Sequence, residues 1–309
     1  MDAEKNQSVL VTGARGFVGR ATVKFLRNAG YEVVALDLAP VVGDELGVTA
    51  VVCDISDATR VRRVFEEHRI AGIVHLAAIL PTVSQREPAR ATEINVVGGL
   101  NLLEMAREFG VRRFVYGSSV SVYGTGSFEH VVSESDPAAP EDVYGAAKLY
   151  VEQIGAAYRK RDGLEFVSLR FGRVLGPGAN SKTSNWRSEI FEFLGAEKPV
   201  KIPIPYLSSE LLLVIYLDDV AHAAVTLLQA PRLEHGIYNA INESIVVADL
   251  KRVAEELNPK VTVQLGAQVM SGNPRRLDSG RFAREFGVGT VPVFERLRQA
   301  REGGGVVSE

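Results

Sequence analysis

Apolar and polar residues form alternating blocks along the first half of the chain, and these blocks predict strands alternating with helices. Short, unbroken apolar runs are typical of strands that are covered on both faces of a sheet. Six such runs occur, at Val9–Val11, Val33–Leu36, Ala50–Val52, Gly72–Leu76, Phe114–Tyr116 and Phe166–Leu169. Helical spacing of apolar residues lies between them, at Thr22–Asn28, Ala58–His68, Ala91–Phe109 and Tyr144–Arg161. We therefore predict an α/β fold with a doubly wound parallel sheet.

The pattern weakens after Gly172, where Gly176–Ser209 is rich in proline and glycine and predicts an irregular cap. Beyond it we expect a strand, a helix, a segment that returns to the main sheet and a further helix, at Val214–Leu217, Asp219–Ala230, Gly236–Ile241 and Val247–Leu257. This organisation predicts a dinucleotide-binding domain over residues 1–175, with returning segments near 214–241. Residues 176–309 then form a smaller, discontinuous C-terminal lobe that binds substrate.

Composition narrows the class of protein. The chain has 309 residues, 46% of them hydrophobic and 24% charged, which is ordinary for a globular protein. Its net charge of −3 does not suggest a nucleic-acid partner. No window reaches the roughly 18 apolar residues that span a bilayer, and the polar first residues lack a signal-peptide core. A single cysteine, Cys53, excludes an internal disulfide and a cysteine metal cluster. We predict a cytoplasmic protein that binds no metal, nucleic acid or membrane.

Three glycines, Gly13, Gly16 and Gly19, join the first predicted strand to the first helix. Glycine lets the backbone turn tightly and approach a pyrophosphate, and the helix N-terminus offers free N–H groups to it. Spaced glycines also occur in ordinary strand–helix turns, so the context matters. The second predicted strand ends in Asp37, whose carboxylate suits the two hydroxyls of an adenosine ribose and would repel a 2′-phosphate. The sequence therefore predicts a dinucleotide site that prefers NAD to NADP.

Tyr144 and Lys148 are four residues apart in a predicted helix and so share one helical face. A nearby ammonium favours phenolate and would lower the pKa of the tyrosine toward the working pH. Tyr144 could then exchange a proton with a substrate hydroxyl while hydride moves to or from a nicotinamide. Alone, the pair would more often be an exposed Tyr and Lys, but the dinucleotide motif upstream favours catalysis.

A serine-rich stretch from Ser118 to Gly124 follows the fifth predicted strand. Ligands of open α/β sheets bind beyond the carboxyl ends of the strands, where a hydroxyl could orient the substrate oxygen beside Tyr144. Serines are also common in such loops without any function.

The motifs together are specific. The chain resembles the extended short-chain dehydrogenase/reductase family, in the epimerase/dehydratase branch that includes the UDP-sugar epimerases. The resemblance rests on Thr12-Gly13-x-x-Gly16-x-x-Gly19, Asp37, Asp54-Ile55, His75-Leu76-Ala77-Ala78, Asn95, Ser118-Ser119-x-x-x-Tyr123-Gly124, Tyr144-x-x-x-Lys148, Leu169-Arg170-Phe171 and Leu217-Asp218-Asp219-Val220-Ala221. It implies a Rossmann domain, an NAD cofactor and a homodimer in which the helices Ala91–Phe109 and Tyr144–Arg161 pair across a two-fold axis.

The resemblance also implies roles for residues. Ser119, Tyr144 and Lys148 form the catalytic trio. The implied cofactor contacts are Gly13, Arg15, Gly16, Phe17, Val18, Asp37, Leu38, Asp54, Ile55, Leu76, Ala77, Ala78, Asn95, Tyr144, Lys148 and Phe171. Asp54 would accept a hydrogen bond from the adenine, or cap the helix that starts near Ala58, or both. Asn95 would steady the backbone of the active site or contact the cofactor. His75 is expected to be a packed core residue and not an acid or base.

The chain departs from this family where UDP-sugar epimerases recognise a diphosphate. Two family arginines align with Leu212 and, roughly, Val269, and a family asparagine is replaced by Arg173. Arg173 could meet a substrate carboxylate or phosphate, or form a salt bridge within its lobe. A smaller hydroxy substrate such as a sugar or sugar acid is therefore favoured. The candidate substrate contacts are Thr82, Ser119, Arg173, Trp186 and Arg275, with the ring face of Trp186 available to stack on a sugar.

Three hypotheses for function follow. The first is an NAD-dependent oxidoreductase acting on a secondary hydroxyl of a small, carbohydrate-like substrate. The second is a nucleotide-sugar epimerase that holds NAD tightly and consumes none. The third is a non-catalytic NAD-binding sensor, against which the intact Ser119, Tyr144 and Lys148 set argues.

Overall fold

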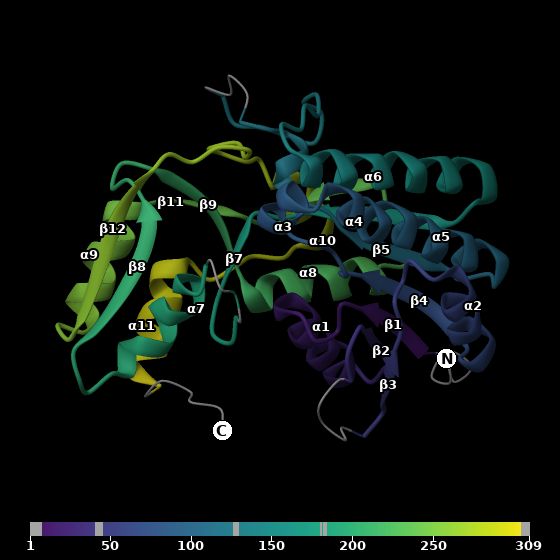
Figure 1. Cartoon of the computed structure of the whole chain (residues 1–309), viewed down its shortest axis with the longest axis horizontal. Coiled ribbons are helices and arrows are strands. Elements are labelled where there is room, and N and C mark those ends of the chain that lie inside the picture. Colours follow the sequence, from purple (N-terminus) through teal and green to yellow (C-terminus); the bar gives the residue numbers. More distant parts are fainter. Residues whose placement is uncertain (1–7, 41–45, 126–129, 180, 182–183, 304–309) are drawn as a thin grey trace.

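A seven-stranded parallel sheet forms the larger lobe of the protein, as Figure 1 shows. The structure is a computed structural model and describes residues 8–40, 46–125, 130–179, 181 and 184–303. In sheet order the strands are β10 (Ile237–Asn239), β6 (Glu165–Arg170), β5 (Arg113–Gly117), β4 (Ile70–His75), β1 (Ser8–Thr12), β2 (Glu32–Asp37) and β3 (Val48–Val52). Every neighbouring pair is parallel. The predicted doubly wound parallel sheet is confirmed.

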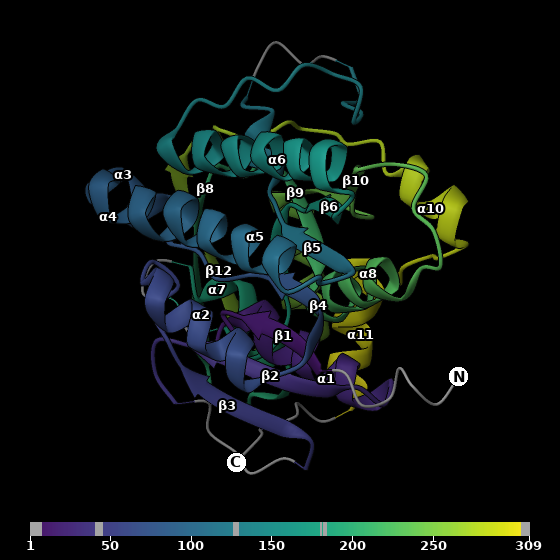
Figure 2. The same ribbon diagram turned by 90° about the vertical axis from the view of Figure 1, so that its right-hand side faces the viewer.

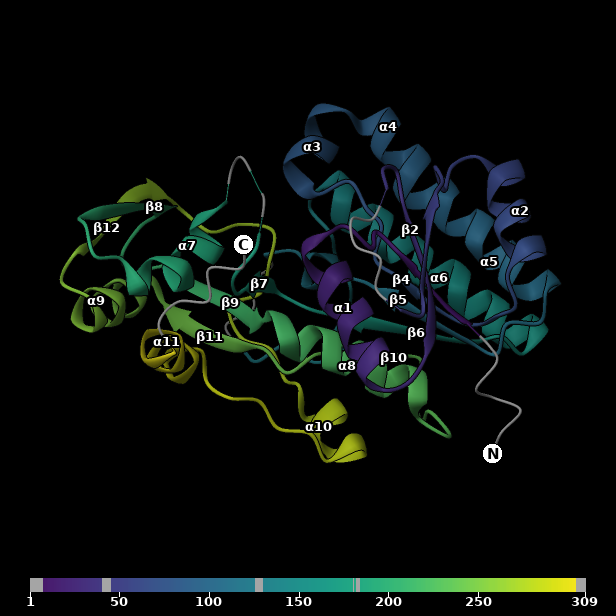
Figure 3. The same ribbon diagram turned by 90° about the horizontal axis from the view of Figure 1, so that it is seen from below.

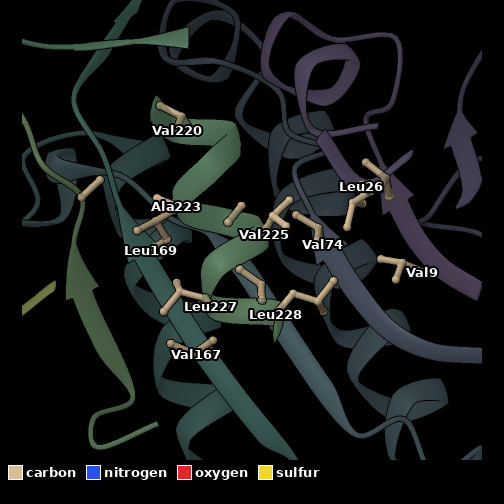
Figure 4. Close-up of a cluster of buried hydrophobic side chains, with 14 of the residues drawn as sticks. Val9, Leu26, Val74, Val167, Leu169, Val220, Ala223, Val225, Leu227 and Leu228 are labelled. Atoms are coloured by element: carbon tan, nitrogen blue, oxygen red, sulfur yellow. The ribbon is translucent and has the colours of Figure 1, made fainter. Parts of the chain in front are cut away.

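Helices cover both faces of this sheet. The helices α1 (Phe17–Asn28) and α8 (Leu217–Gln229) pack side by side on one face. The other face carries α2 (Ala58–Glu67), α5 (Gly98–Glu108) and α6 (Val143–Asp162), and Figure 2 shows the two layers on opposite sides of the strands. In Figure 4, Val225, Leu227 and Leu228 of α8 point at Val74 and Val167 of the sheet. Each such fully buried side chain stabilises the fold by about 1.5–3 kcal/mol, so α8 fixes the sheet firmly.

The single helix predicted over Ala91–Phe109 is wrong in one detail. The segment begins as α4 (Pro88–Thr92), passes through a π-helical turn at Glu93–Val97 and continues as α5. Asn95 lies in that turn, and its side-chain amide holds the backbone of Ile79 on the neighbouring loop. Single π turns inside helices are frequent at functional sites because they re-aim one side chain.

The second lobe lies beyond the carboxyl ends of the strands, on the left in Figures 1 and 3. It contains a three-stranded sheet in the order β11 (Glu243–Val246), β9 (Leu211–Tyr216) and β7 (Arg173–Leu175), and a two-stranded sheet of β12 (Val261–Gln268) and β8 (Val200–Tyr206). Its helices are α7 (Trp186–Glu192), α9 (Val247–Leu257) and α11 (Val293–Glu302). Two short helices, α3 (Pro81–Arg86) and α10 (Gly280–Phe286), and two 3₁₀ turns, at Val120–Val122 and Phe193–Gly195, complete the described elements.

The irregular cap predicted over Gly176–Ser209 is therefore wrong, because this stretch contains α7 and β8. Prolines at positions 203 and 205 suggested a loop. In β8, however, Ile202 and Ile204 point into the core while Pro203 points outward, and the strand has only β12 beside it among the described strands. An edge strand tolerates proline because one of its sides needs no donor.

Two strands that the sequence predicted after the cap belong to different sheets. Ile237–Asn239 pairs with β6 and becomes its edge strand, as expected. The strand expected at Val214–Leu217 is instead β9, which belongs to the small sheet and leads at Leu217 directly into α8. The division of the chain near residue 175 stays a prediction.

Candidate active site

The glycine-rich turn between β1 and α1 is built for close backbone approach. Gly13 has φ +69°, a conformation that other residues rarely adopt, and its carbonyl accepts the N–H of Gly16 at 2.9 Å. A Cβ at Gly13 would lie only 2.8 Å from the backbone nitrogen of Ala77. The helix α1 starts immediately afterwards, at Phe17. A tight glycine turn at a helix N-terminus fits the pyrophosphate of a dinucleotide.

Replacing Gly13 with Ala should destabilise the protein and weaken NAD binding. Gly110 is the matched control because its φ of +67° is nearly the same but nothing lies within 4 Å of an added Cβ. We expect G110A to cost about 1–2 kcal/mol through backbone strain alone, and G13A to cost about 2 kcal/mol more through its clash with Ala77. Urea unfolding and NAD titration calorimetry measure both effects. Equal losses in the two variants would contradict the close-approach argument.

Asp37 lies beside this turn at the carboxyl end of β2. Its carboxylate accepts the backbone N–H of Arg15 at 2.9 Å and that of Leu38 at 2.7 Å. The two bonds fix the carboxylate against the glycine turn while the side chain stays partly exposed. Since a carboxylate oxygen accepts more than one hydrogen bond, Asp37 keeps capacity for ribose hydroxyls. These residues together fit the adenosine half of NAD.

Asp54 is held by its own neighbourhood. One carboxylate oxygen accepts from the backbone and hydroxyl of Ser56, and the other pairs with Arg90 at 2.9 Å. It does not cap α2, as one interpretation of the sequence had it. Asp57 does, by accepting the N–H groups of Thr59 and Arg60. Ile55 is buried in the core, so only its backbone could meet an adenine.

Hydrogen bonds also organise the loop that follows β4. The hydroxyl of Thr12 accepts the N–H groups of Leu76 and Ala77, both at 3.2 Å, and bonds Nδ1 of His75 at 2.7 Å. Because that hydroxyl has one proton, it donates it to His75 while accepting from the backbone. Burial lowers the pKa of His75 to about 3, and the charge of Lys148 acts in the same direction. His75 is thus a neutral core residue that supports the loop up to Ala78.

This burial should make stability fall in mild acid. Below its usual pKa of 6.5 the unfolded chain protonates His75, whereas the folded chain resists protonation down to about pH 3. The stability contributed by neutral His75 is therefore lost progressively as pH falls through that window. The wild type should lose about 2 kcal/mol more than H75N between pH 6.5 and about pH 5. Urea unfolding at both pH values gives the comparison, and parallel pH profiles of the two proteins would contradict it.

The structure brings Ser119, Tyr144 and Lys148 together. Asp142 caps α6 by accepting the N–H of Gly145 at 2.7 Å, which places Tyr144 in the first turn and Lys148 in the second. Ser119, which follows β5, lies beside Tyr144, and its hydroxyl lowers the pKa of the phenol. The Nζ of Lys148 donates to the carbonyl of Gly117 at 2.6 Å and lies 5.6 Å from the centre of the Tyr144 ring.

The predicted lowering of the Tyr144 pKa is wrong for the protein alone. Burial raises the pKa of Tyr144 above its ordinary value, and the nearby hydroxyl of Ser119 offsets only part of this. Burial also lowers the pKa of Lys148 to about 7, against the attraction of Glu152. Desolvation opposes the charged form of both groups and is the largest cause of each shift. Near neutral pH the phenol is therefore protonated and the ammonium is close to losing its proton.

A buried ion pair beneath the trio was missed from the sequence. Glu152 and Arg170, each 3% exposed, form a two-pronged pair with N–O distances of 2.9 and 2.5 Å. Ser118 donates to the same carboxylate at 2.5 Å. Glu152 is the third member of a four-residue spacing that starts with Tyr144 and Lys148, and that spacing could have revealed it. The pair connects α6 to β6, and Ser118 connects both to the segment from Ser118 to Gly124, which we call the serine turn.

The candidate substrate residues divide into two groups. Thr82 and Arg275 are exposed, and the carbonyl of Arg275 accepts the hydroxyl of Ser244. Trp186 is 2% exposed in the core of the second lobe, so its ring offers no open face for a sugar, contrary to the prediction. Arg173 lies against this ring, 5.9 Å from its centre. Phe171 accepts the N–H of Val120 with its carbonyl and so contacts the serine turn through its backbone.

One group of side chains has the composition of a metal site. Ligand atoms of Glu234, His235 and Glu285 all lie within 4.8 Å of one another. The carboxylate of Glu285 is already engaged with the N–H of Glu234 and the hydroxyl of Tyr238. Arg281 and Arg284 line the same hollow, and their charges oppose a cation. This group of Glu234, His235 and Glu285 is separate from the candidate cofactor, catalytic and substrate residues described above.

Comparison with known proteins identifies the family. The sequence profile of the NAD dependent epimerase/dehydratase family matches residues 9–240. The chain belongs to this family. This match confirms the family that was predicted from the motifs. It also agrees with the prediction of an NAD-dependent enzyme.

Individual members of the family give a finer picture. UDP-glucose 4-epimerase of Lacticaseibacillus casei is 35% identical over 175 residues, 55% of this chain and 52% of that protein. The mitochondrial L-threonine 3-dehydrogenase of Sus scrofa is 28% identical over 258 residues, 80% of this chain and 68% of that protein. The structure of UDP-glucose 4-epimerase from Thermus thermophilus in complex with NAD superposes with a TM-score of 0.84, at 28% identity, over 98% of this chain and 100% of that one. The chain spans about half the length of the curated epimerases that it matches.

Within the described part of the chain, no helix combines the length and the apolar character needed to cross a bilayer.

Proposed function

We propose that the protein is an NAD-dependent oxidoreductase acting on a secondary hydroxyl of a small, carbohydrate-like substrate. The observation that carries this is the juxtaposition of Tyr144, Ser119 and Lys148 beyond the carboxyl ends of the strands. The glycine turn and Asp37 lie at the same edge of the sheet. Ligands of open α/β sheets bind at this edge.

NAD, when bound there, supplies a hydride acceptor and a positive charge on its oxidised ring. Gly13, Gly16 and the N-terminus of α1 would hold its pyrophosphate, and Asp37 its ribose. The positive charge of the oxidised ring would favour loss of the phenolic proton of Tyr144 to solvent. The phenolate would then take the proton of the substrate hydroxyl, which Ser119 orients. Lys148 donates to the carbonyl of Gly117 at 2.6 Å and keeps further N–H groups for the nicotinamide ribose.

A substrate screen tests this proposal. The protein is incubated with NAD and a panel of aldoses, sugar acids, L-threonine and UDP-glucose, and the absorbance of NADH is followed. Net NADH formation with one class of secondary alcohol supports the oxidoreductase. A protein that binds NAD but turns over no member of a broad panel would contradict it.

Nucleotide-sugar epimerisation is the alternative, and the epimerase relatives favour it. Epimerisation would invert the configuration at one carbon of UDP-glucose without accumulation of NADH. Two departures weigh against it. Leu212, where the family has an arginine, is completely buried in the core of the second lobe, and Val269, near the other arginine position, is 63% exposed and apolar. The site therefore lacks these two charges for a diphosphate. The relatives give no support to a sensor without activity.

We also propose a homodimer in the cytoplasm. Val97, at the end of the π turn, and Tyr150 on α6 are large apolar or aromatic side chains that are 41% and 52% exposed on adjacent helices. Burying them against a second copy would remove apolar surface from water. Sedimentation velocity should give a dimer for the wild type and a monomer for V97E.

The proposed location in the cytoplasm rests on a different feature. The single, buried thiol of Cys53 suits a reducing compartment.

A further inference from the structure

Two arginines of the second lobe, Arg173 and Arg187, lie next to each other without an acidic partner in the described part of the chain. A guanidinium nitrogen of Arg187 approaches the carbonyl of Val174, the residue after Arg173, at 3.4 Å. Both side chains are partly shielded from solvent, and neither forms an ion pair with a carboxylate that the structure describes. Burial and the charge of Arg173 lower the pKa of Arg187 to about 10. Two like charges in a poorly solvated place repel each other, and an anion between them would relieve this repulsion.

Aromatic and sulfur groups hold Arg173 in place without neutralising it. Its guanidinium lies 5.0 Å from the ring centre of Tyr206 and 5.9 Å from that of Trp186. One nitrogen contacts the sulfur of Met270 at 3.7 Å. These contacts fix the direction of the side chain but leave its strong hydrogen-bond donors without an oxygen acceptor among the described residues. The arrangement is that of an orientated cation and not of a structural ion pair.

The arginine pair lies between the serine turn and the glycine turn. On one side, Arg173 is two residues after Phe171, whose carbonyl accepts the N–H of Val120. The loop that follows Met270 also reaches the serine turn, where Asn273 accepts the hydroxyl of Ser121 at 3.0 Å. On the other side, the guanidinium of Arg187 lies 6.0 Å from the ring centre of Phe17, the first residue of α1.

We propose that Arg173 and Arg187 form a receptor for an anionic group of the substrate, a carboxylate or a phosphate. This rests on the proposed function and narrows its substrate class to hydroxy acids or phosphorylated sugars. A neutral sugar would leave the two charges without a counter-ion. The planar donor forks of arginine match the two oxygens of a carboxylate or phosphate in both number and spacing.

The chain carries its own reporter for this site, because Trp186 is its only tryptophan and lies against Arg173. The enzyme saturated with NAD is titrated with malonate, inorganic phosphate and, as a salt control, sodium chloride, while Trp fluorescence is followed. We expect a saturable change with malonate or phosphate and none with chloride. The stronger of the two probes tells carboxylate from phosphate recognition.

Matched variants then test the two arginines. R173Q and R187Q should bind the preferred probe at least about tenfold more weakly, whereas R252Q, which alters an exposed arginine on α9, should bind it normally. R173K and R187K keep the charge and should recover part of the affinity, which guards against misfolding of the glutamine variants. Unchanged affinity in R173Q and R187Q, or no saturable response in the wild type, overturns the proposal.

NAD titration of the same proteins separates this proposal from the proposed function. Weaker NAD binding in R173Q or R187Q, or displacement of NAD by phosphate, would assign the arginines to the cofactor pyrophosphate and overturn a substrate receptor. Normal NAD binding together with loss of anion binding supports the receptor. A wild type that binds no NAD would instead refute the oxidoreductase itself.

Discussion

Replacing Tyr144 with Phe is expected to lower kcat by about 10³-fold, because the substrate hydroxyl loses the group that takes its proton. NAD affinity should be nearly unchanged, since the ring and the neighbouring Lys148 remain. The hydroxyl that is removed lies beside Ser119, on a side chain that is 8% exposed. Steady-state kinetics on the substrate found by the screen, with NAD calorimetry beside it, measure the two quantities.

Y150F is the matched control for this variant. Tyr150 lies on the same helix, α6, but is 52% exposed, whereas Tyr144 is buried. The same hydroxyl removed six residues further along should leave kcat within about twofold of the wild type, because a spacing of six residues places Tyr150 on a different face of α6 from Tyr144. A Y144F enzyme that turns over at the wild-type rate would remove Tyr144 from the mechanism.

Breaking the pair of Glu152 and Arg170 is expected to be the most destabilising single change. R170M would leave the carboxylate of Glu152 buried with only Ser118 as donor among the described residues, at a cost of about 3–5 kcal/mol. The double variant E152M/R170M removes both charges and should recover much of that loss. Urea unfolding of the two single variants and the double variant gives the coupling energy.

R252M serves as the control for that experiment. Arg252 pairs with Glu256 and Asp249 on α9, but its side chain is 55% exposed. Its loss should cost less than about 1 kcal/mol. If R170M costs no more than R252M, the buried pair does not hold α6 on the sheet. A loss in the double variant as large as the sum of both single variants would point to packing and not to charge.

The sequence predicted the main sheet well because its strands are buried on both faces and carry the plainest pattern. Val9–Val11 and Phe166–Leu169 are examples, and each lies inside the strand that the structure contains. The second lobe was harder to predict from the sequence. Its strand β8 alternates isoleucine with lysine and proline, and only its place at an edge makes the prolines harmless. Local pattern does not reveal which strand is an edge.

The sequence predicted that the candidate residues lie together, but it did not predict their electrostatics. The spacing of Tyr144 and Lys148 predicted the shared face, and the structure brings Ser119 to them. The direction of the Tyr144 pKa was wrong because it depends on burial, which helical spacing does not determine. The surroundings of Arg173 and Arg187 likewise depend on packing between segments far apart in sequence. Their guanidinium groups lie against Tyr206 and Phe17, which are far from them in the chain.

The helix α8 begins at Leu217, immediately after β9 ends at Tyr216. The chain crosses between the lobes at several further links, among them those from β6 to β7, from β10 to β11 and from α10 to α11. Rotation about any one of these links strains the others and disturbs the packing of α8 on the main sheet. The two lobes are therefore held in a nearly fixed orientation. In such an architecture, a change of substrate is achieved by exchanging side chains, while the frame that carries them stays the same.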